Sequence, residues 1–393
     1  MKLWKIAKLN EVANIERMSI QPKQIKDETI YVGLEHIEKG GRFIGLKTVK
    51  NGELASSKFQ FTKRHILYGK LRPYLAKIAC PEFSGICSTD ILPILPKSNV
   101  DRKFLFHFLR QPKIVDYANS QAVGINLPRL SPSVLTNLEI PLPPLEEQKR
   151  IAEILDQAEE LRRKRKEAIA LLDTLTQSIF LEMFGDPVVN PKGWEQLPFA
   201  ELLTNIDSGW SPVCLDHPVS GEEWGVLKLG AVTWCEYDHT QNKALPPNVE
   251  PDPNLEVKTG DLLFTRKNTY DLVGACVLVR ETPPRLMMSD LIFRFRLRAD
   301  ANVNPCFLHQ LLIYPTKRRN IQKLAGGSAS SMPNISKAKL QTTLIEVPPL
   351  SLQKEFAQRV EAVEELKKSH RASLLELDAL FASLQHRAFK GEL

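Results

Sequence analysis

The chain has 393 residues, roughly two to three times the length of a typical domain, and its 43% hydrophobic and 25% charged residues are usual for a globular protein. No apolar run approaches the roughly 18 residues of a membrane span, and the six cysteines include no C-x-x-C pair, which argues against a disulfide framework or a zinc site. The net charge of +7 lies mainly in residues 1–145, where 22 Lys and Arg face 12 Asp and Glu. Such a basic surface is suited to neutralising phosphate.

The first third of the chain indicates a β-rich domain that ends at residue 142. Short runs of β-branched and aromatic residues alternate with Gly, Lys and Asn turns, which is typical of strands. Aromatic and basic residues mix in the segment 66–74. The other predicted elements are strands at 30–34, 43–46, 88–92 and 138–140, a helix at about 101–119 and a glycine-bearing loop at 124–131.

A long helix is predicted over residues 143–185. It opens with Pro143-Pro144-Leu145-Glu146-Glu147-Gln148-Lys149, where proline suits the first turn because the N–H it lacks would be unpaired there anyway. Gly185-Asp186-Pro187 ends it. Apolar residues recur every seven positions from Ile151, a pattern that favours packing against a partner helix.

The second half of the chain repeats the first. Pro348-Pro349-Leu350 opens a second long helix, predicted over 348–393, at a constant displacement of 205 residues. The region 186–347 before it, a linker followed by a second β-rich domain, retraces the order of the first domain, including a helix at about 305–324 and a loop at 327–336. The whole chain is therefore predicted to be a duplicated unit of β-rich domain and long helix.

Two equivalent units related by a pseudo-two-fold axis place their long helices antiparallel, so we expect an antiparallel coiled coil. Two ordinary amphipathic core helices are the alternative. Arg165 and His370 occupy equivalent positions at the helix midpoints and are expected to form one polar layer. The predicted interface comprises Ile151, Ile154, Leu161, Arg165, Leu172, Leu175 and Ile179 with Val363, Leu366, His370, Leu377, Leu380 and Leu384.

No catalytic motif is evident in the sequence. A glycine-rich cofactor turn, an Asn- or Asp-Pro-Pro-aromatic motif, a P-loop and H-E-x-x-H are all missing. The segment 251–258 resembles a nuclease metal motif, but its Asp252 and Glu256 are four residues apart in a proline-rich turn, whereas that chemistry takes its carboxylates from separate strands. We therefore expect no catalytic residue and no metal site in this chain.

The two domains, the two helix openings and the junction Phe184-Gly185-Asp186-Pro187 with Asn190-Pro191-Lys192-Gly193-Trp194 together resemble the DNA-specificity subunit of type I restriction-modification systems. The resemblance covers the full length. The second opening departs from it slightly, with Ser351-Leu352 where the first copy has Glu146-Glu147. The resemblance implies an α+β fold in which two β-rich target-recognition domains are joined by two long helices that form an antiparallel coiled coil.

In that family each domain reads half of a split, asymmetric DNA target, and the helices dock two modification subunits. The resemblance therefore implies a non-catalytic chain that binds double-stranded DNA, methyltransferase subunits and restriction subunits. It implies no cofactor in this chain, because the partners bind S-adenosylmethionine, ATP and Mg. Without a membrane span or a signal-peptide core, the protein is expected in the cytoplasm. A coiled-coil adaptor without a DNA role, or a self-contained methyltransferase or nuclease, remains an alternative.

For contact with DNA we favour polar residues in the two equivalent loops and in the basic segments that precede them. Arg suits guanine and Asn suits adenine, and either can bind phosphate instead. The expected DNA-binding residues are Lys70, Arg72, Asn126, Arg129, Arg266, Lys267, Asn268, Ser331 and Asn334.

Overall fold

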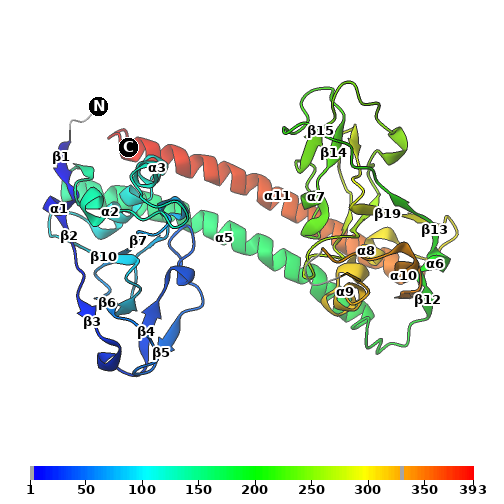
Figure 1. The fold of residues 1–393 in the computed structure, drawn as a ribbon, viewed down its shortest axis with the longest axis horizontal. Helices are drawn as coiled ribbons and strands as arrows, with labels where there is room; N and C mark the ends of the chain where they lie inside the picture. The colour runs from blue at the N-terminus through cyan, green and yellow to red at the C-terminus, as the bar shows by residue number, and fades with distance from the viewer. Residues whose placement is uncertain (1–3, 328–331) are drawn as a thin grey trace. The chain divides into compact units, whose positions relative to one another are not determined.

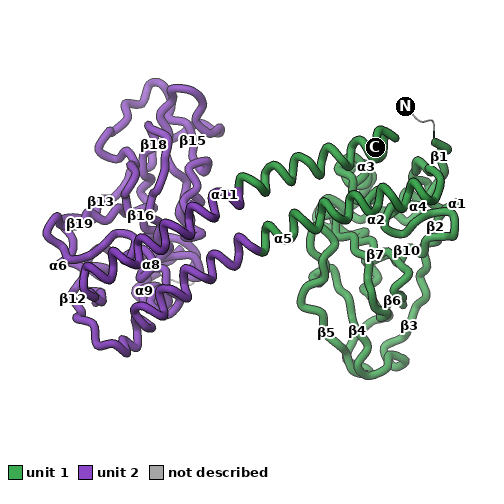
Figure 2. The backbone as a smooth tube through the Cα atoms, turned by 180° about the vertical axis from the view of Figure 1, so that it is seen from behind, with its two compact units in different colours: residues 1–167, 372–393 green, residues 168–371 purple. Residues whose placement is uncertain are grey.

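A computed structural model describes residues 4–327 and 332–393 of the chain, which divides into two compact units (Figures 1 and 2). Unit 1 comprises residues 1–167 and 372–393, and unit 2 comprises residues 168–371. Each unit contains a sheet-rich region, and the two long helices are α5 (Leu145–Phe184) and α11 (Leu350–Ala388), which confirms the predicted α+β class. Each long helix is divided between the two units, so neither helix forms a separate domain.

Unit 1 is built from short strands with four short helices around them. The strands are β1 (Lys5–Lys8), β2 (Ala13–Ile15), β3 (Ser19–Ile20), β4 (Thr29–Val32), β5 (Lys47–Val49), β6 (Lys58–Phe61), β7 (Ile66–Gly69), β8 (Ile78–Ala79), β9 (Gly85–Cys87), β10 (Ile91–Pro96) and β11 (Glu139–Leu142). The helices are α1 (Leu9–Val12), α2 (Arg102–Leu109), α3 (Pro112–Ser120) and α4 (Pro132–Thr136). A four-stranded sheet has the order β2-β10-β7-β8, a five-stranded sheet has the order β3-β6-β9-β4-β5, and β1 pairs with β11.

Unit 2 repeats most of this topology, which confirms that the duplication extends through both domains, although its described residues form no strands that match β3 and β6. Its strands are β12 (Gln196–Pro198), β13 (Leu203–Ser208), β14 (Gly225–Leu227), β15 (Asn242–Ala244), β16 (Leu262–Thr265), β17 (Cys276–Leu278), β18 (Leu286–Met287), β19 (Ile292–Leu297) and β20 (Leu344–Glu346). Its short helices are α6 (Phe199–Leu202), α7 (Gly230–Thr233), α8 (Pro305–Ile313), α9 (Pro315–Gln322) and α10 (Lys337–Gln341). The order β13-β19-β16-β17 matches β2-β10-β7-β8, β12-β20 matches β1-β11, and β15-β14-β18 matches β5-β4-β9.

Three predictions about local structure are wrong. The single helix expected at 101–119 is two helices, α2 and α3, and the one expected at 305–324 is likewise split into α8 and α9. Each break falls just before a proline, Pro112 or Pro315, because proline lacks the N–H of a helix interior and pushes the preceding residue out of the helical conformation. The strand expected at 43–46 is reduced to one isolated bridge between Phe43 and Ile37.

Both ends of each long helix are anchored in an apolar core. In unit 1 the core takes Ile151 and Leu155 from the start of α5 and Phe389 from just beyond α11. In unit 2 the equivalent residue Phe184, at the end of α5, packs with its ring centre 4.7 Å from that of Phe307. Each core therefore holds the beginning of one long helix and the end of the other.

Polar contacts add to this anchoring in unit 1, where α2 lies along α5. Arg110 makes two parallel bonds to Glu159, with Nη1–Oε2 at 2.8 Å and Nη2–Oε1 at 2.6 Å. Although burial opposes it, these bonds hold the pKa of Glu159 below its ordinary value. One turn away, Nε2 of His107 lies 2.7 Å from Oδ1 of Asp156.

The start of α5 is fixed by the side chain of Gln148, which is 1% exposed. Its Oε1 accepts a hydrogen bond from the backbone N–H of Asp101 at 2.8 Å. Its Nε2 donates to the carbonyl oxygens of Pro143 at 2.8 Å and Asn99 at 3.2 Å. One amide thus joins Pro143, the first of the two prolines that open the helix, to Asp101, the residue that caps α2.

Gln353 does the same in unit 2, where it is fully buried. Its Oε1 accepts from the N–H of Asn304 at 2.8 Å, and its Nε2 donates to the carbonyl oxygens of Pro348 at 2.7 Å and Asn302 at 3.0 Å. The Pro-Pro-Leu-x-x-Gln motif is therefore a backbone clamp in both copies, which explains why it varies so little between them.

The structure also bears on the sequence-based expectations about cysteines, metals and membranes. All six cysteines are free, and burial raises the pKa of the Cys87 thiol to about 12. Among residues 4–327 and 332–393, no cluster of three or more His, Cys, Asp or Glu side chains is placed to bind a metal ion. Over the same ranges, every helix is too short or too polar to cross a lipid bilayer.

Replacing Gln148 by Ala should lower the free energy of unfolding of unit 1 by about 2 kcal/mol or more, because the Asp101 N–H and two carbonyl groups lose their partner. Urea denaturation, combined with hydrogen exchange of peptides from α2, measures the effect. Gln157→Ala is the matched control, since Gln157 is an exposed glutamine on the same helix. Equal stability of the two variants would contradict the clamp.

Candidate nucleic-acid interface

In unit 1 the segment that leaves β7 is held between two other segments by backbone hydrogen bonds. The Lys70 N–H donates to the Asp90 carbonyl at 2.9 Å, just before β10 begins. On the other side, the Leu130 N–H donates to the Lys70 carbonyl at 2.9 Å and the Arg72 N–H donates to the Pro128 carbonyl at 2.7 Å. This junction brings the basic end of β7 against the glycine-bearing loop.

The junction gathers all four DNA-contact residues predicted in the first domain. The Asp90 carboxylate lies between Lys70, with Nζ 3.8 Å from Oδ1, and Arg129, with Nε 3.1 Å from Oδ1. Arg72 is exposed and has a left-handed backbone (φ 51°), and its Nη2 lies 3.5 Å from the Asn126 carbonyl. With three cations and one carboxylate, the cluster keeps a positive charge.

Asp90 orients Arg129 without covering it. The carboxylate binds the guanidinium through Nε and, at 3.5 Å, through Nη2, while the side chain stays 46% exposed. A guanidinium has five N–H donors. The Nη1 group and the second Nη2 hydrogen therefore remain for a ligand, and such a pair of parallel donors matches O6 and N7 of guanine.

Unit 2 contains the same junction at the end of β16. The Arg266 N–H donates to the Leu291 carbonyl at 3.0 Å, the Ile335 N–H donates to the Arg266 carbonyl at 2.8 Å, and the Asn268 N–H donates to the Pro333 carbonyl at 3.4 Å. Isolated β-bridges also match. They are Leu71–Arg129 and Val123–Arg129 in unit 1, and Lys267–Asn334 and Gly326–Asn334 in unit 2.

The side chains at this second junction differ from those at the first. Nε of Arg266 donates to Oδ1 of Asn334 at 3.1 Å, and the guanidinium lies 5.1 Å from the centre of the Phe293 ring. Lys337 lies over the same ring at 5.6 Å. Lys267 is half-buried and joins Asn334 through its backbone. No carboxylate equivalent to Asp90 takes part, because the matching position is Leu291.

Asn268 is a correction to the predicted DNA-contact set. Its side chain is 5% exposed, donates to Oγ1 of Thr233 at 3.2 Å and accepts from the N–H of Thr269 at 2.8 Å. A buried amide with its hydrogen bonds made inside the domain holds the turn and is not available to DNA. Ser331, also predicted, lies outside the described residues.

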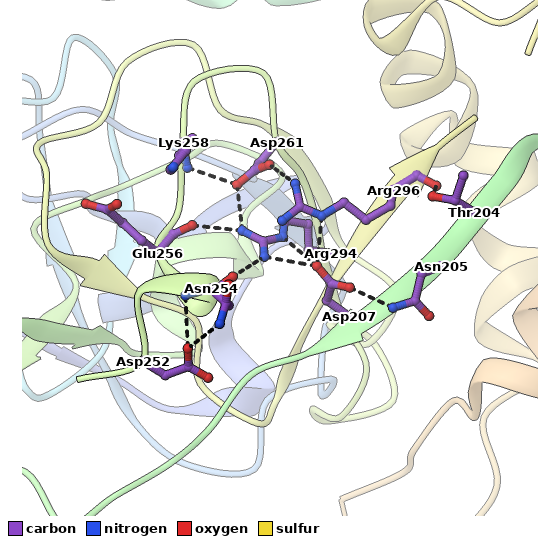
Figure 3. Close-up of polar contacts among 10 residues, drawn as sticks. All are labelled: Thr204, Asn205, Asp207, Asp252, Asn254, Glu256, Lys258, Asp261, Arg294 and Arg296. Atoms are coloured by element: carbon purple, nitrogen blue, oxygen red, sulfur yellow. Dashed lines mark hydrogen bonds and ion pairs between the residues drawn. The ribbon is translucent and has the colours of Figure 1, made fainter. Parts of the chain in front are cut away.

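Arg294 in β19 is the largest fully buried side chain of the described chain, at 1% exposure (Figure 3). Its Nε donates to Asp207 at 3.0 Å and its Nη1 to Asp261 at 3.1 Å. Its Nη1 and Nη2 also donate to the carbonyls of Glu256 at 2.8 Å and Asn254 at 2.6 Å. Although burial opposes it, the arginines that bind Asp207 hold its pKa below the ordinary value.

Residues 262–346 contain 13 Lys and Arg against 5 Asp and Glu, a count that by itself predicts a basic face, but the buried network removes part of that charge from the surface. Arg294 is taken up by the interior of unit 2, and so is Lys317, whose side chain is 7% exposed and lies 2.6 Å from Glu346. Neither cation can reach phosphate. The number of Lys and Arg residues in this segment therefore overestimates the positive charge on its surface, because the sequence does not show which of these side chains are buried.

The nuclease-like segment 251–258 has a structural role in the same region (Figure 3). Oδ1 of Asp252 accepts from the N–H of Asn254 at 2.9 Å, and Oε1 of Glu256 accepts from the N–H of Arg285 at 2.8 Å. Both carboxylates therefore satisfy backbone donors of their own surroundings.

In unit 1 the long helices lie antiparallel. Nε of Arg162 on α5 is 2.5 Å from Oδ1 of Asp378 on α11, and its guanidinium lies 4.5 Å from the ring centre of Phe381. Nearer the start of α5, Nη2 of Arg150 donates to the carbonyl of Leu393 at 2.8 Å. An earlier residue of α5 thus lies beside a later residue of the C-terminal segment, as expected for antiparallel helices.

Unit 2 shows the same direction. Nζ of Lys367 on α11 lies 2.7 Å from Oδ1 of Asp173 on α5. Farther along α5, the Phe180 ring centre lies 5.6 Å from that of Phe356, which is earlier on α11. In each unit, then, the two helix segments run in opposite directions.

Burial along the helices differs from the predicted apolar seam. Leu161 and Leu366 are each 53% exposed, Leu380 is 48% exposed and Leu175 is 43% exposed. These leucines are a correction to the seam, because the inter-helix contacts beside them are ion pairs. Ile151 and Val363 are buried. The remaining predicted interface residues are half-buried: Ile154, Arg165, Leu172, Ile179, His370, Leu377 and Leu384.

Replacing Arg294 by Met should destabilise unit 2 by about 3–5 kcal/mol, because Asp207 and Asp261 would lose their buried cation and keep only the half-exposed Arg296. Chemical denaturation measures the change. The control is Arg298→Met, which removes an exposed pair with Asp300 and should leave the stability of unit 2 nearly unchanged. A small effect at Arg294 would mean that the network does not hold the loop 252–261.

Comparison with known proteins shows which proteins the chain is similar to. A family model described as "Type I restriction modification DNA specificity domain" matches residues 1–171. The type I restriction enzyme EcoEI specificity subunit of Escherichia coli is 36% identical over 176 residues, 44% of this chain and 30% of that protein. The EcoDI specificity subunit of Escherichia coli is 31% identical over 186 residues, 46% of this chain and 41% of that protein. The chain thus spans less than half the length of these two relatives.

Two similarities extend farther along the chain. The putative type I restriction enzyme MjaX specificity subunit of Methanocaldococcus jannaschii is 25% identical over 423 residues, 99% of this chain and 93% of that protein. Among solved structures, the type I restriction-modification system S subunit from M. genitalium matches 98% of this chain and 96% of its own, with a TM-score of 0.61 at 13% identity.

A chain from work on complex assembly and conformational transition of the type I R-M system matches 99% of this chain and 98% of its own, with a TM-score of 0.57 at 21% identity. At these identities the two structures show a common fold. Residues 1–171 therefore match the type I restriction modification DNA specificity domain, and unit 2 repeats strand orders found in that region.

Proposed function

We propose that this chain is the DNA-specificity subunit of a type I restriction-modification complex and that each unit reads one half of a bipartite, asymmetric target. The observation that carries the proposal is the repeated junction, where one backbone arrangement holds Arg129 in unit 1 and Asn334 in unit 2. Arg pairs with guanine and Asn with adenine through two hydrogen bonds each. The same geometry can thus read different bases in the two halves.

Within each junction the residues divide into two roles. Arg129 and Asn334 stand at the loop and are assigned to base edges. Lys70, Arg72, Arg266 and Lys267 lie at the end of the preceding strand and are assigned to phosphates, which fix the orientation of a protein on the duplex but carry no sequence information. Asn126 lies at the loop tip and is assigned to bases.

The long helices are assigned to docking of two modification subunits and, with them, of restriction subunits. The half-exposed leucines Leu161, Leu175, Leu366 and Leu380 support this assignment, since they leave apolar surface that a partner can cover. By the same proposal this chain is non-catalytic, and S-adenosylmethionine, ATP and Mg are bound by the partners.

Two alternatives have direct tests. A self-contained enzyme would transfer a labelled methyl group to DNA when only this chain and the cofactor are present. A coiled-coil adaptor without a DNA role would show no salt-sensitive affinity for duplex DNA. Neither class accounts for two equivalent junctions lined by cations.

Replacing Lys70 and Arg72 together by Ala should weaken DNA binding and flatten its dependence on salt, because the log–log slope falls by about 0.9 for each phosphate that is no longer neutralised. Titrations at several salt concentrations measure the slope. Lys164→Ala with Lys166→Ala removes the same charge from exposed positions on α5 and should leave the slope unchanged. An unchanged slope in the first variant would mean that Lys70 and Arg72 face away from DNA.

Exchanging residues 1–142 for the corresponding domain of a relative should change one half of the target and leave the other half as it was. The reason is that each unit has its own junction and its own core. Selecting bound duplexes from a randomised pool and sequencing them gives both halves. A simultaneous change in both would rule out independent readout.

A further inference from the structure

The tip of the glycine-bearing loop in unit 1 exposes apolar side chains. Ile125 is 100% exposed, Val123 is 80% exposed and Leu127 is 46% exposed. Single exposed apolar residues are common on protein surfaces, whereas a group of them within five positions points to a surface that binds something.

The tip is held in place by the hydrogen bonds at its base. Val123 and Arg129 exchange two backbone hydrogen bonds, of 3.0 and 2.9 Å, which close a narrow hairpin. The Arg72 N–H ties the hairpin to the end of β7 through the Pro128 carbonyl at 2.7 Å. Gly124, with φ +121°, makes the turn where a side chain would be strained. The exposed side chains are thus presented by a fixed support.

The base of the hairpin is cationic. Arg72 lies 3.5 Å from the Asn126 carbonyl, and Arg129 ends the hairpin beside Asp90 and Lys70. The cations beside the tip suit the polyanionic backbone of a duplex, because Lys70 and Arg72, which are assigned to phosphates, lie next to the strand that carries Arg129. Charge complementarity therefore selects a duplex as the occupant.

The major groove is about 12 Å wide and admits a two-stranded hairpin. The apolar group that it presents is the C5 methyl of thymine, which an aliphatic side chain can cover. Unit 2 has an apolar residue at the matching place, since Met332 precedes Asn334 by two positions, as Leu127 precedes Arg129, and is 42% exposed.

We propose that Ile125 enters the major groove of the half-site read by unit 1 and contacts a thymine methyl group, so that thymine is selected there over cytosine. This inference rests on the proposed function and adds a specificity contact of apolar type to the hydrogen bonds assigned to Arg129 and Asn126.

The test uses the full chain and the target selected from a randomised duplex pool, with the unit 1 half-site identified by the exchange of residues 1–142. Each thymine of that half-site, on both strands, is replaced in turn by deoxyuridine, which removes only the methyl group. One replacement should lower affinity about fourfold, the effect of removing one buried methyl group. In Ile125→Ala the same replacement should have no further effect.

Ile125→Ala should also lower affinity for the unmodified target about tenfold while the salt slope stays unchanged, because the same phosphates remain neutralised. Val189→Ala, at a linker residue that is 73% exposed, is the matched control and should bind as the unchanged chain does.

A half-site without thymine, indifference to every deoxyuridine replacement, or full DNA affinity in Ile125→Ala would each overturn the proposed thymine contact. The last result would point to a protein partner at the tip. These outcomes leave the proposed function standing, which only the absence of salt-sensitive, target-selective binding by the unchanged chain would remove.

Discussion

The architecture depends on one buried amide in each unit. Gln148 and Gln353 each satisfy one N–H and two carbonyl groups where a long helix begins, and thereby fix the helix to the capping residue of the neighbouring short helix. Each of these backbone groups would be costly to bury without a partner. The direction in which each helix leaves its domain is thus set by local hydrogen bonding, independent of the domain's outer loops.

That separation allows the outer parts of the two domains to diverge. The strand orders match, yet the same junction carries Arg129 with a carboxylate partner in unit 1 and Asn334 with an arginine partner in unit 2. Backbone bonds fix where the side chain stands, and under the proposed function the side chain then decides which base edge is read. The side chain can therefore differ between the two units while the backbone position that carries it stays the same.

The sequence predicted what depends on periodicity and repetition, namely the duplication and the two long helices. The sequence-based predictions were wrong where the outcome depends on which side chains are buried. The sequence does not distinguish an arginine that faces solvent from one that, like Arg294, is buried against two carboxylates. Heptad spacing likewise predicted that Leu161 is buried between the helices, whereas the nearby inter-helix contacts are ion pairs and Leu161 is exposed. Pro112 and Pro315 are signals in the sequence at which each predicted helix divides into two.

The division of the chain also affects the order of synthesis and folding. Residues 168–371 form unit 2 without interruption, whereas unit 1 needs residues 372–393, and the Phe389 ring lies 5.2 Å from that of Phe104 in its core. Contacts between residues so far apart in sequence form slowly, because a long loop must close first. On the ribosome, the domain translated first is therefore completed last, and its unfilled core is exposed while the whole of unit 2 is made.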